Sequence, residues 1–215
     1  MPRDSHRDQP ILVQGAPLAD AAGAVILAHG RGGSARDMQE LAREIDRPQF
    51  AYLAPEAAGH TWYPYSMLER LERNQSHLSS ALCLLEKVLA KVATAGVPAA
   101  RVVLLGFSQG GCLVLEFAAR HARRYGGIVG LSGGLIGPEG TPREYAGSLD
   151  GTPVFLGCSD VDPHVPKRRV DETETVFERL GANVTKRIYQ GMGHTTNADE
   201  MAFVSSMLDG VAGHR

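Results

Sequence analysis

The chain has 215 residues, with 22 lysines and arginines against 24 aspartates and glutamates and a formal net charge of −2. This length suits one domain, which can bury a core without disulfides or metals. The near-neutral balance and the lack of a basic stripe exclude nucleic acid as an expected partner.

The polar residues 1–10 lack the apolar centre of a secretory signal peptide, and we expect them to form a flexible N-terminal segment. The apolar run 24–28 is too short to span a bilayer, so no membrane partner is expected. Three cysteines without a C-x-x-C pair suggest neither a disulfide framework nor a zinc site. The sequence therefore predicts reduced thiols and a cytoplasmic protein.

Strand and helix patterns alternate along the chain. Residues 24–28 form a continuous apolar run, which is typical of a buried parallel strand. Ser34 and Asp37 have the spacing of a helix capping box. The expected strands are 11–13 at an edge, 24–28, 50–54, 101–105, 128–131, 154–157 and 184–189. The expected helices begin after residue 34, include 78–92, follow residue 110, cover 170–180 and begin near residue 197. This alternation predicts one α/β domain over 1–215, with a mostly parallel sheet covered on both faces.

A serine lies between two glycines where a strand meets a helix. Gly106, Ser108 and Gly110 match the pattern G-x-S-x-G, with an apolar strand before it and a helix after it. A serine nucleophile needs this tight turn, and glycines two residues to either side avoid Cβ clashes within it. The pattern in this context predicts that Ser108 is a nucleophile.

A serine hydroxyl needs a histidine to accept its proton and a carboxylate to orient that histidine. His6 and His214 lie in polar ends of the chain, whereas His194 follows the last expected strand in a glycine-rich loop. Loops at that edge of an open α/β sheet gather catalytic groups. We therefore expect His194 to be the base.

The carboxylate is expected in the loop after strand 154–157, where Asp160 and Asp162 both qualify. Asp162 precedes a proline that favours an extended conformation, while Asp160 could cap the turn by accepting backbone N–H groups. We choose Asp162. Residues 160–164 could also supply metal ligands, but no second cluster completes such a site, and no metal or other cofactor is expected.

Two backbone N–H groups are expected to bind the oxyanion that forms during attack on a carbonyl. The residue after the nucleophile, Gln109, supplies the first from the start of its helix. The second is expected from Arg31, in the glycine-rich loop that follows strand 24–28. A phosphate-binding role for this loop is disfavoured, because neither a following Lys-Ser/Thr pair nor G-x-G-x-x-G spacing is present.

Four motifs stand in order: His-Gly-Arg31-Gly, Gly-Phe-Ser108-Gln-Gly, Asp162-Pro-His-Val-Pro and Gly-Met-Gly-His194. Together they resemble the phospholipase/carboxylesterase family of α/β-hydrolases, which includes acyl-protein thioesterases and small bacterial carboxylesterases. The resemblance covers almost the whole chain from residue 24. It implies the same triad and the same oxyanion N–H groups, no cofactor, and a possible homodimer. Arg31 and segment 62–65 are closer to the small bacterial carboxylesterases than to the thioesterases.

Residues 132–153 are too few for a separate cap domain, so we expect an open cleft. Its expected rim includes Leu135, Ile136 and Trp62, although Trp62 could instead anchor its own loop. Such a cleft suits a small-molecule ester, and the sequence predicts a serine carboxylesterase. An acyl thioesterase or lysophospholipase with the same triad is the alternative. A non-catalytic binding protein is disfavoured, because all three expected triad residues are present.

Overall fold

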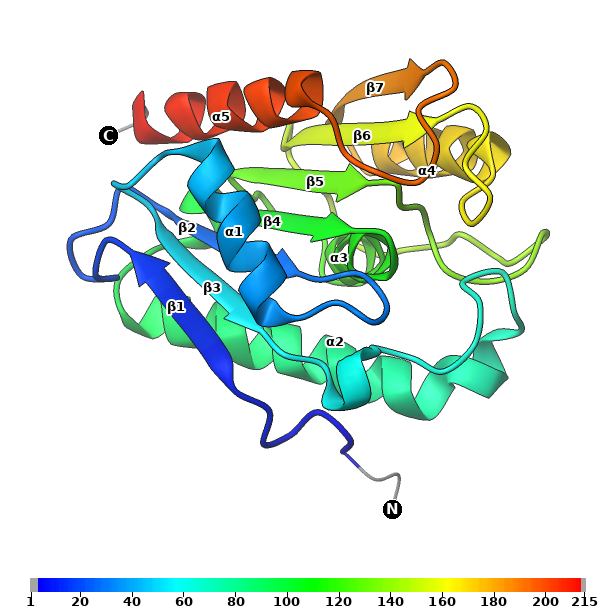
Figure 1. Cartoon of the computed structure of the whole chain (residues 1–215), viewed down its shortest axis with the longest axis horizontal. Helices are drawn as coiled ribbons and strands as arrows, with labels where there is room; N and C mark the ends of the chain where they lie inside the picture. Colours follow the sequence, from blue (N-terminus) through cyan, green and yellow to red (C-terminus); the bar gives the residue numbers. More distant parts are fainter. Residues whose placement is uncertain (1–3, 214–215) are drawn as a thin grey trace.

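A seven-stranded sheet with the order β1-β3-β2-β4-β5-β6-β7 forms the centre of the computed structural model, which describes residues 4–213 (Figure 1). Six strands are parallel, and only β1 at one edge runs antiparallel to its neighbour β3. The strands are β1 Ile11–Gly15, β2 Ala24–Ala28, β3 Ala51–Pro55, β4 Val102–Phe107, β5 Gly127–Leu131, β6 Pro153–Ser159 and β7 Asn183–Tyr189. The predicted α/β class, mostly parallel sheet and edge strand are confirmed.

Within the described residues, five α-helices cover the two faces of this sheet, as predicted (Figure 1). They are α1 Ala35–Ile45, α2 Leu71–Thr94, α3 Gln109–Arg120, α4 Lys167–Arg179 and α5 Ala198–Gly213. Alternate residues of each strand point to opposite faces. In β2, Val25 and Leu27 pack with α1 and α5, whereas Ile26 packs with α2, α3 and α4. Two apolar layers therefore hold the sheet in place, and the loops at its carboxyl edge are left to form a site.

The helix ends agree with the local sequence signals, with one extension. Ser34 and Asp37 form the predicted capping box at the start of α1. Helix α2 begins at Leu71, ahead of the apolar stripe that the sequence identifies from Leu78 onward. Buried Asn74 anchors this first turn, because its side chain accepts from the backbone N–H of Tyr65 and donates to the carbonyl of Ser66.

Residues 4–6 pack against the domain, contrary to the expectation of a flexible segment. His6 is fully buried, and its backbone N–H donates to the Ser80 hydroxyl. Asp4 accepts from the same hydroxyl. Polarity alone misled the prediction, since these polar groups find partners on α2. Residues 1–3 and His214 lie outside the described residues. In the described part of the chain, no helix is both long and apolar enough to cross a bilayer.

Candidate active site

Ser108 occupies the turn between β4 and α3, with a left-handed φ of 55° and a ψ of −118°. A Cβ atom on Gly106 would lie 2.2 Å from the carbonyl oxygen of Gly110, and one on Gly110 would lie 2.0 Å from that of Ala28. Only glycine therefore fits at either position. The close approach of strand and helix holds the serine at the carboxyl edge of the sheet.

Ser108, His194 and Asp162 form a continuous chain of hydrogen bonds. His194 Nε2 lies 2.7 Å from Ser108 Oγ, and His194 Nδ1 lies 2.7 Å from Asp162 Oδ2. The His194 side chain is 19% exposed and the Asp162 side chain is fully covered. This is the geometry that lets a histidine accept the serine proton while a carboxylate fixes its tautomer. The three residues singled out from the sequence thus lie together.

Asp162 is held in its charged form by several donors. Burial alone would raise the pKa of this carboxyl, but the hydrogen bond from His194 and those from the backbone N–H groups of His164 and Val165 outweigh it and lower the pKa. A carboxylate that remains ionised stabilises an imidazolium beside it. The loop after β6 is therefore suited to support a histidine that gains a proton.

The loop that carries His194 is fastened to the end of β6. Asp160 Oδ1 accepts from the backbone N–H of Gly191 at 2.8 Å, and Ser159 Oγ accepts from that of Gly193 at 3.1 Å. Asp160, the competing acid in the sequence, thus caps a turn instead of meeting His194. Within residues 4–213, no group of three or more His, Cys, Asp and Glu side chains could hold a metal ion.

Arg31 and Gln109, the two expected sources of oxyanion N–H groups, line the same cavity as Ser108. Gln109 is the first residue of α3, where a helical N–H has no partner within its own helix. Arg31 lies in the loop between β2 and α1. Neither N–H donates to any acceptor in the part of the chain that the structure describes. The positive end of the α3 dipole adds to the attraction for an anion at Ser108.

A cavity of about 520 Å³ opens beside Ser108 and His194. Its polar rim includes Arg31, Ser66 and His164, whose ring meets that of His194 edge-on at 4.8 Å between centroids. The remaining wall consists of Gln109 and a mostly apolar set, Tyr63, Met67, Leu68, Cys112, Pro163 and Val165. All three cysteines of the chain are free, and burial raises the pKa of the Cys112 thiol to about 11. Cys112 is therefore a neutral wall group and no nucleophile at neutral pH.

Trp62 does not line this cavity, contrary to its expected place on the rim. It is fully buried, and its indole N–H donates to the carbonyl of His29 at 2.8 Å. The ring centroids of His6 and His29 lie 5.6 and 4.9 Å from the centroid of the Trp62 ring. The alternative interpretation of Trp62 as a loop anchor is correct, since an indole buried with its N–H satisfied stabilises more than an exposed one.

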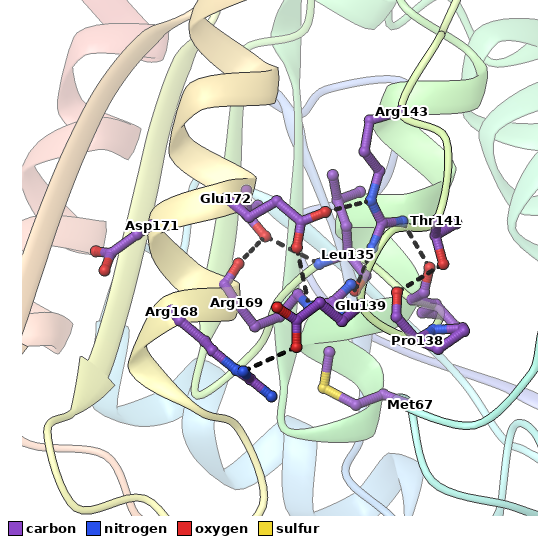
Figure 2. A network of polar contacts seen from close by, with 12 residues as sticks. Met67, Leu135, Pro138, Glu139, Thr141, Arg143, Arg168, Arg169, Asp171 and Glu172 are labelled. Carbon is purple, nitrogen blue, oxygen red and sulfur yellow. Dashed lines mark hydrogen bonds and ion pairs between the residues drawn. The ribbon is translucent and has the colours of Figure 1, made fainter.

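Leu135 and Ile136 are also fully buried and lie away from the cavity wall, so their placement on the rim is wrong. Figure 2 shows Arg143 and Arg169 in the polar network around this segment, and their guanidinium groups bind its backbone. Arg143 donates to the carbonyl of Ile136 at 2.6 Å and Arg169 to that of Leu135 at 3.0 Å. Met67 and Leu68 line the cavity where Leu135 and Ile136 were expected. They come from a loop whose sequence shows no periodic pattern.

The histidines around Trp62 predict a stability that falls in mild acid. His6 Nδ1 accepts from the backbone N–H of Ala58, and His29 Nε2 accepts from that of Ala57, so both rings are neutral. Burial lowers the pKa of both below the usual 6.5. The unfolded chain then binds more protons than the folded one, and the free energy of unfolding decreases as the pH falls from about 6.5 through the lower folded-state values.

This dependence can be measured from the fluorescence of Trp62, the single tryptophan, during urea unfolding at pH 7, 6 and 5. His6→Gln keeps a donor for the Trp62 carbonyl and removes one titrating group, so its slope against pH should be shallower. One proton corresponds to at most about 1.4 kcal/mol per pH unit. Burial raises the pKa of Glu200 to about 7, so this residue makes the free energy of unfolding increase as the pH falls. The wild type and His6→Gln both contain Glu200, so its contribution to the two slopes is the same. Identical slopes would contradict the prediction.

The order of the sheet and the position of Ser108 after β4 define an α/β-hydrolase fold. A family model described as phospholipase/carboxylesterase matches residues 13–211, and the chain belongs to this family.

Individual relatives agree with this assignment. A phospholipase/carboxylesterase structure from Dyadobacter fermentans is 41% identical, with a TM-score of 0.90 over 94% of this chain and 96% of that one. The structure of esterase PE8 is 27% identical, with a TM-score of 0.76 over 94% and 98% of the two chains. Acyl-protein thioesterase 1 of Neurospora crassa is 26% identical over 94% of this chain and 91% of its own length.

Proposed function

We propose that this member of the family is a serine carboxylesterase that hydrolyses small carboxylic esters through an acyl intermediate on Ser108. The observation that carries the proposal is the unbroken chain of hydrogen bonds from Ser108 Oγ through His194 to Asp162, beside an open cavity. Nothing in this geometry requires a cofactor. The cytoplasmic location and the possible homodimer stay predictions.

In the first half of the reaction, Ser108 Oγ attacks the ester carbonyl while His194 Nε2 takes its proton. The carbonyl oxygen becomes an oxyanion, which the backbone N–H groups of Arg31 and Gln109 bind. Collapse of this intermediate breaks the bond to the leaving alcohol, and His194 returns the proton to the alcohol oxygen. Water activated by His194 then attacks the acyl-serine, releases the acid and restores the Ser108 hydroxyl.

The size and lining of the cavity support a small substrate. A volume of about 520 Å³ lies in the lower half of the range of ligand pockets. Met67, Leu68 and Val165 offer apolar contact for a short acyl group, while Ser108 is reached from the open side. The name of the Neurospora crassa relative favours a thioesterase as the second candidate. Both activities would use the same triad.

The test combines a covalent probe with a panel of substrates. A fluorophosphonate should label the wild-type chain, and peptide mapping should place the label on Ser108, because only an activated serine reacts. A matched series of oxyesters and thioesters of graded acyl length then separates the two candidates. We expect the highest kcat/KM with acetate or butyrate oxyesters. Faster turnover of long-chain thioesters would replace the proposal by the second candidate, and an unlabelled chain would refute both.

A further inference from the structure

The segment from Thr61 to Tyr65 is fastened to the oxyanion loop by one side chain. The guanidinium group of Arg31 donates to four neutral oxygens of this segment. Its Nη1 donates to the hydroxyl of Thr61 at 3.1 Å and to the carbonyl of Pro64 at 2.9 Å. Its Nη2 donates to the carbonyls of Tyr63 and Tyr65 at 2.9 and 2.7 Å. All four N–H bonds of its two terminal nitrogens are therefore directed at this one segment.

The side chain of Gln109 holds the same segment from the other side. This side chain is buried, and its Oε1 accepts from the backbone N–H of Trp62 at 2.9 Å and from the hydroxyl of Thr61 at 3.1 Å. Its Nε2 donates to the carbonyl of Tyr63 at 2.7 Å. The side chains of the two residues proposed to supply the oxyanion N–H groups thus share Thr61 and Tyr63 as hydrogen-bond partners.

Charge neutralisation does not account for the place of Arg31. In the range 4–213, no carboxylate forms an ion pair with its guanidinium. Its partners are three carbonyls and one hydroxyl, which fix direction and distance. The planar, forked guanidinium can reach all four at once, whereas the compact ammonium of lysine cannot.

The backbone at Arg31 needs such an external constraint. Gly30 precedes it and Gly32 and Gly33 follow it, with Gly32 at a φ of +75° and no atom within 4 Å of the position of a Cβ. Glycines leave the neighbouring peptide groups free to rotate. An oxyanion donor, however, must be held to within about 0.5 Å of its working position. The four side-chain bonds, together with the 2.8 Å bond from Gly32 N–H to the His60 carbonyl, supply this constraint.

We propose that Arg31 and Gln109 are positioning residues, whose side chains lock segment 61–65 to the oxyanion loop so that the Tyr63 wall and both oxyanion N–H groups keep one fixed arrangement. This inference rests on the proposed function and adds a role for the two side chains. Arg31 acts through its own backbone N–H, and its guanidinium does not bind the substrate.

The test compares Arg31→Ala with the wild type in three measurements. Loss of one oxyanion donor costs about 10²–10³ in kcat, and a displaced donor should cost roughly 10–100-fold, with KM nearly unchanged. The affinity for an alkylboronic acid, which forms a tetrahedral adduct with the serine, should fall by the same factor. The melting temperature should stay within a few degrees, because Arg31 is exposed. Arg43→Ala, at an exposed position on α1, is the matched control and should match the wild type in all three measurements.

Two further arms separate positioning from a general structural effect. Methylguanidinium added at millimolar concentration should restore part of the kcat of Arg31→Ala and leave Arg43→Ala unchanged. Arg31→Lys should recover little, since one ammonium cannot span the four acceptors. Thr61→Val removes the hydroxyl that both side chains share and should lower kcat severalfold, which keeps the test open if Arg31→Ala folds poorly.

The proposal would be overturned if Arg31→Ala and Thr61→Val both had the same kcat and the same boronate affinity as the wild type. So would a raised KM with kcat unchanged, because that result assigns the guanidinium to substrate binding. These outcomes presuppose an active wild-type chain. A wild type that neither hydrolyses esters nor reacts with a fluorophosphonate contradicts the proposed function itself, so the two failures are distinguishable.

Discussion

Ser108→Ala is expected to lower kcat for a p-nitrophenyl ester by at least about 10⁴-fold. The methyl group cannot attack the carbonyl, and the residual rate then depends on the oxyanion N–H groups and on binding alone. The nearby Cys112 thiol offers no replacement nucleophile, since burial raises its pKa to about 11. Labelling by a fluorophosphonate should disappear together with turnover.

The control for this variant is Ser79→Ala, an exposed serine on α2 that lies outside the hydrogen-bond chain. It should retain the wild-type rate. The melting temperature of Ser108→Ala should also stay close to that of the wild type, because alanine at a φ of 55° is strained to a similar degree as serine. A folded Ser108→Ala that keeps its turnover would remove Ser108 from the mechanism.

Gly110→Ala is expected to destabilise the protein by at least about 3 kcal/mol, because the added methyl group has no room. A Cβ at this position would lie 2.0 Å from the Ala28 carbonyl oxygen and 2.5 Å from that of His29, and both are backbone atoms. Helix α3 must then move away from the end of β2. In a chain of this length the melting temperature should fall by roughly 6–12 °C, and esterase activity should fall as the oxyanion loop shifts.

Gly210→Ala is the matched comparison for this prediction, with the opposite sign. Gly210 is exposed in α5, and a Cβ there meets no atom within 4 Å. Alanine in a helix is more favourable than glycine by about 1 kcal/mol, so this variant should be slightly more stable and fully active. Urea unfolding measures both changes. Equal stability of Gly110→Ala and the wild type would show that the approach of α3 to β2 is not as tight as described.

The class of fold and the grouping of Ser108, Asp162 and His194 were predictable from the sequence because their signals are local. A buried parallel strand is apolar throughout, and G-x-S-x-G between strand and helix encodes a turn that only glycines allow. The order serine, acid, histidine follows from the order of the strands, whose carboxyl ends meet at one edge. The proline after Asp162 favoured this residue over Asp160, the glycine-rich loop after β2 pointed to Arg31, and the resemblance to the family supported both choices.

The wall of the cavity and the role of each buried polar group were decided by the tertiary structure. Whether an apolar residue lines a cavity or fills the core depends on neighbours distant in the chain, as Trp62, Leu135 and Ile136 illustrate. His6 looked like part of a polar tail, yet partners on α2 and beside Trp62 bury it. The Arg31 side chain binds three carbonyls and one hydroxyl of segment 61–65. Every residue has a backbone carbonyl, so the sequence does not indicate which carbonyls an arginine will bind. A sequence specifies which groups can form hydrogen bonds, whereas only the folded chain determines which groups come within reach of one another.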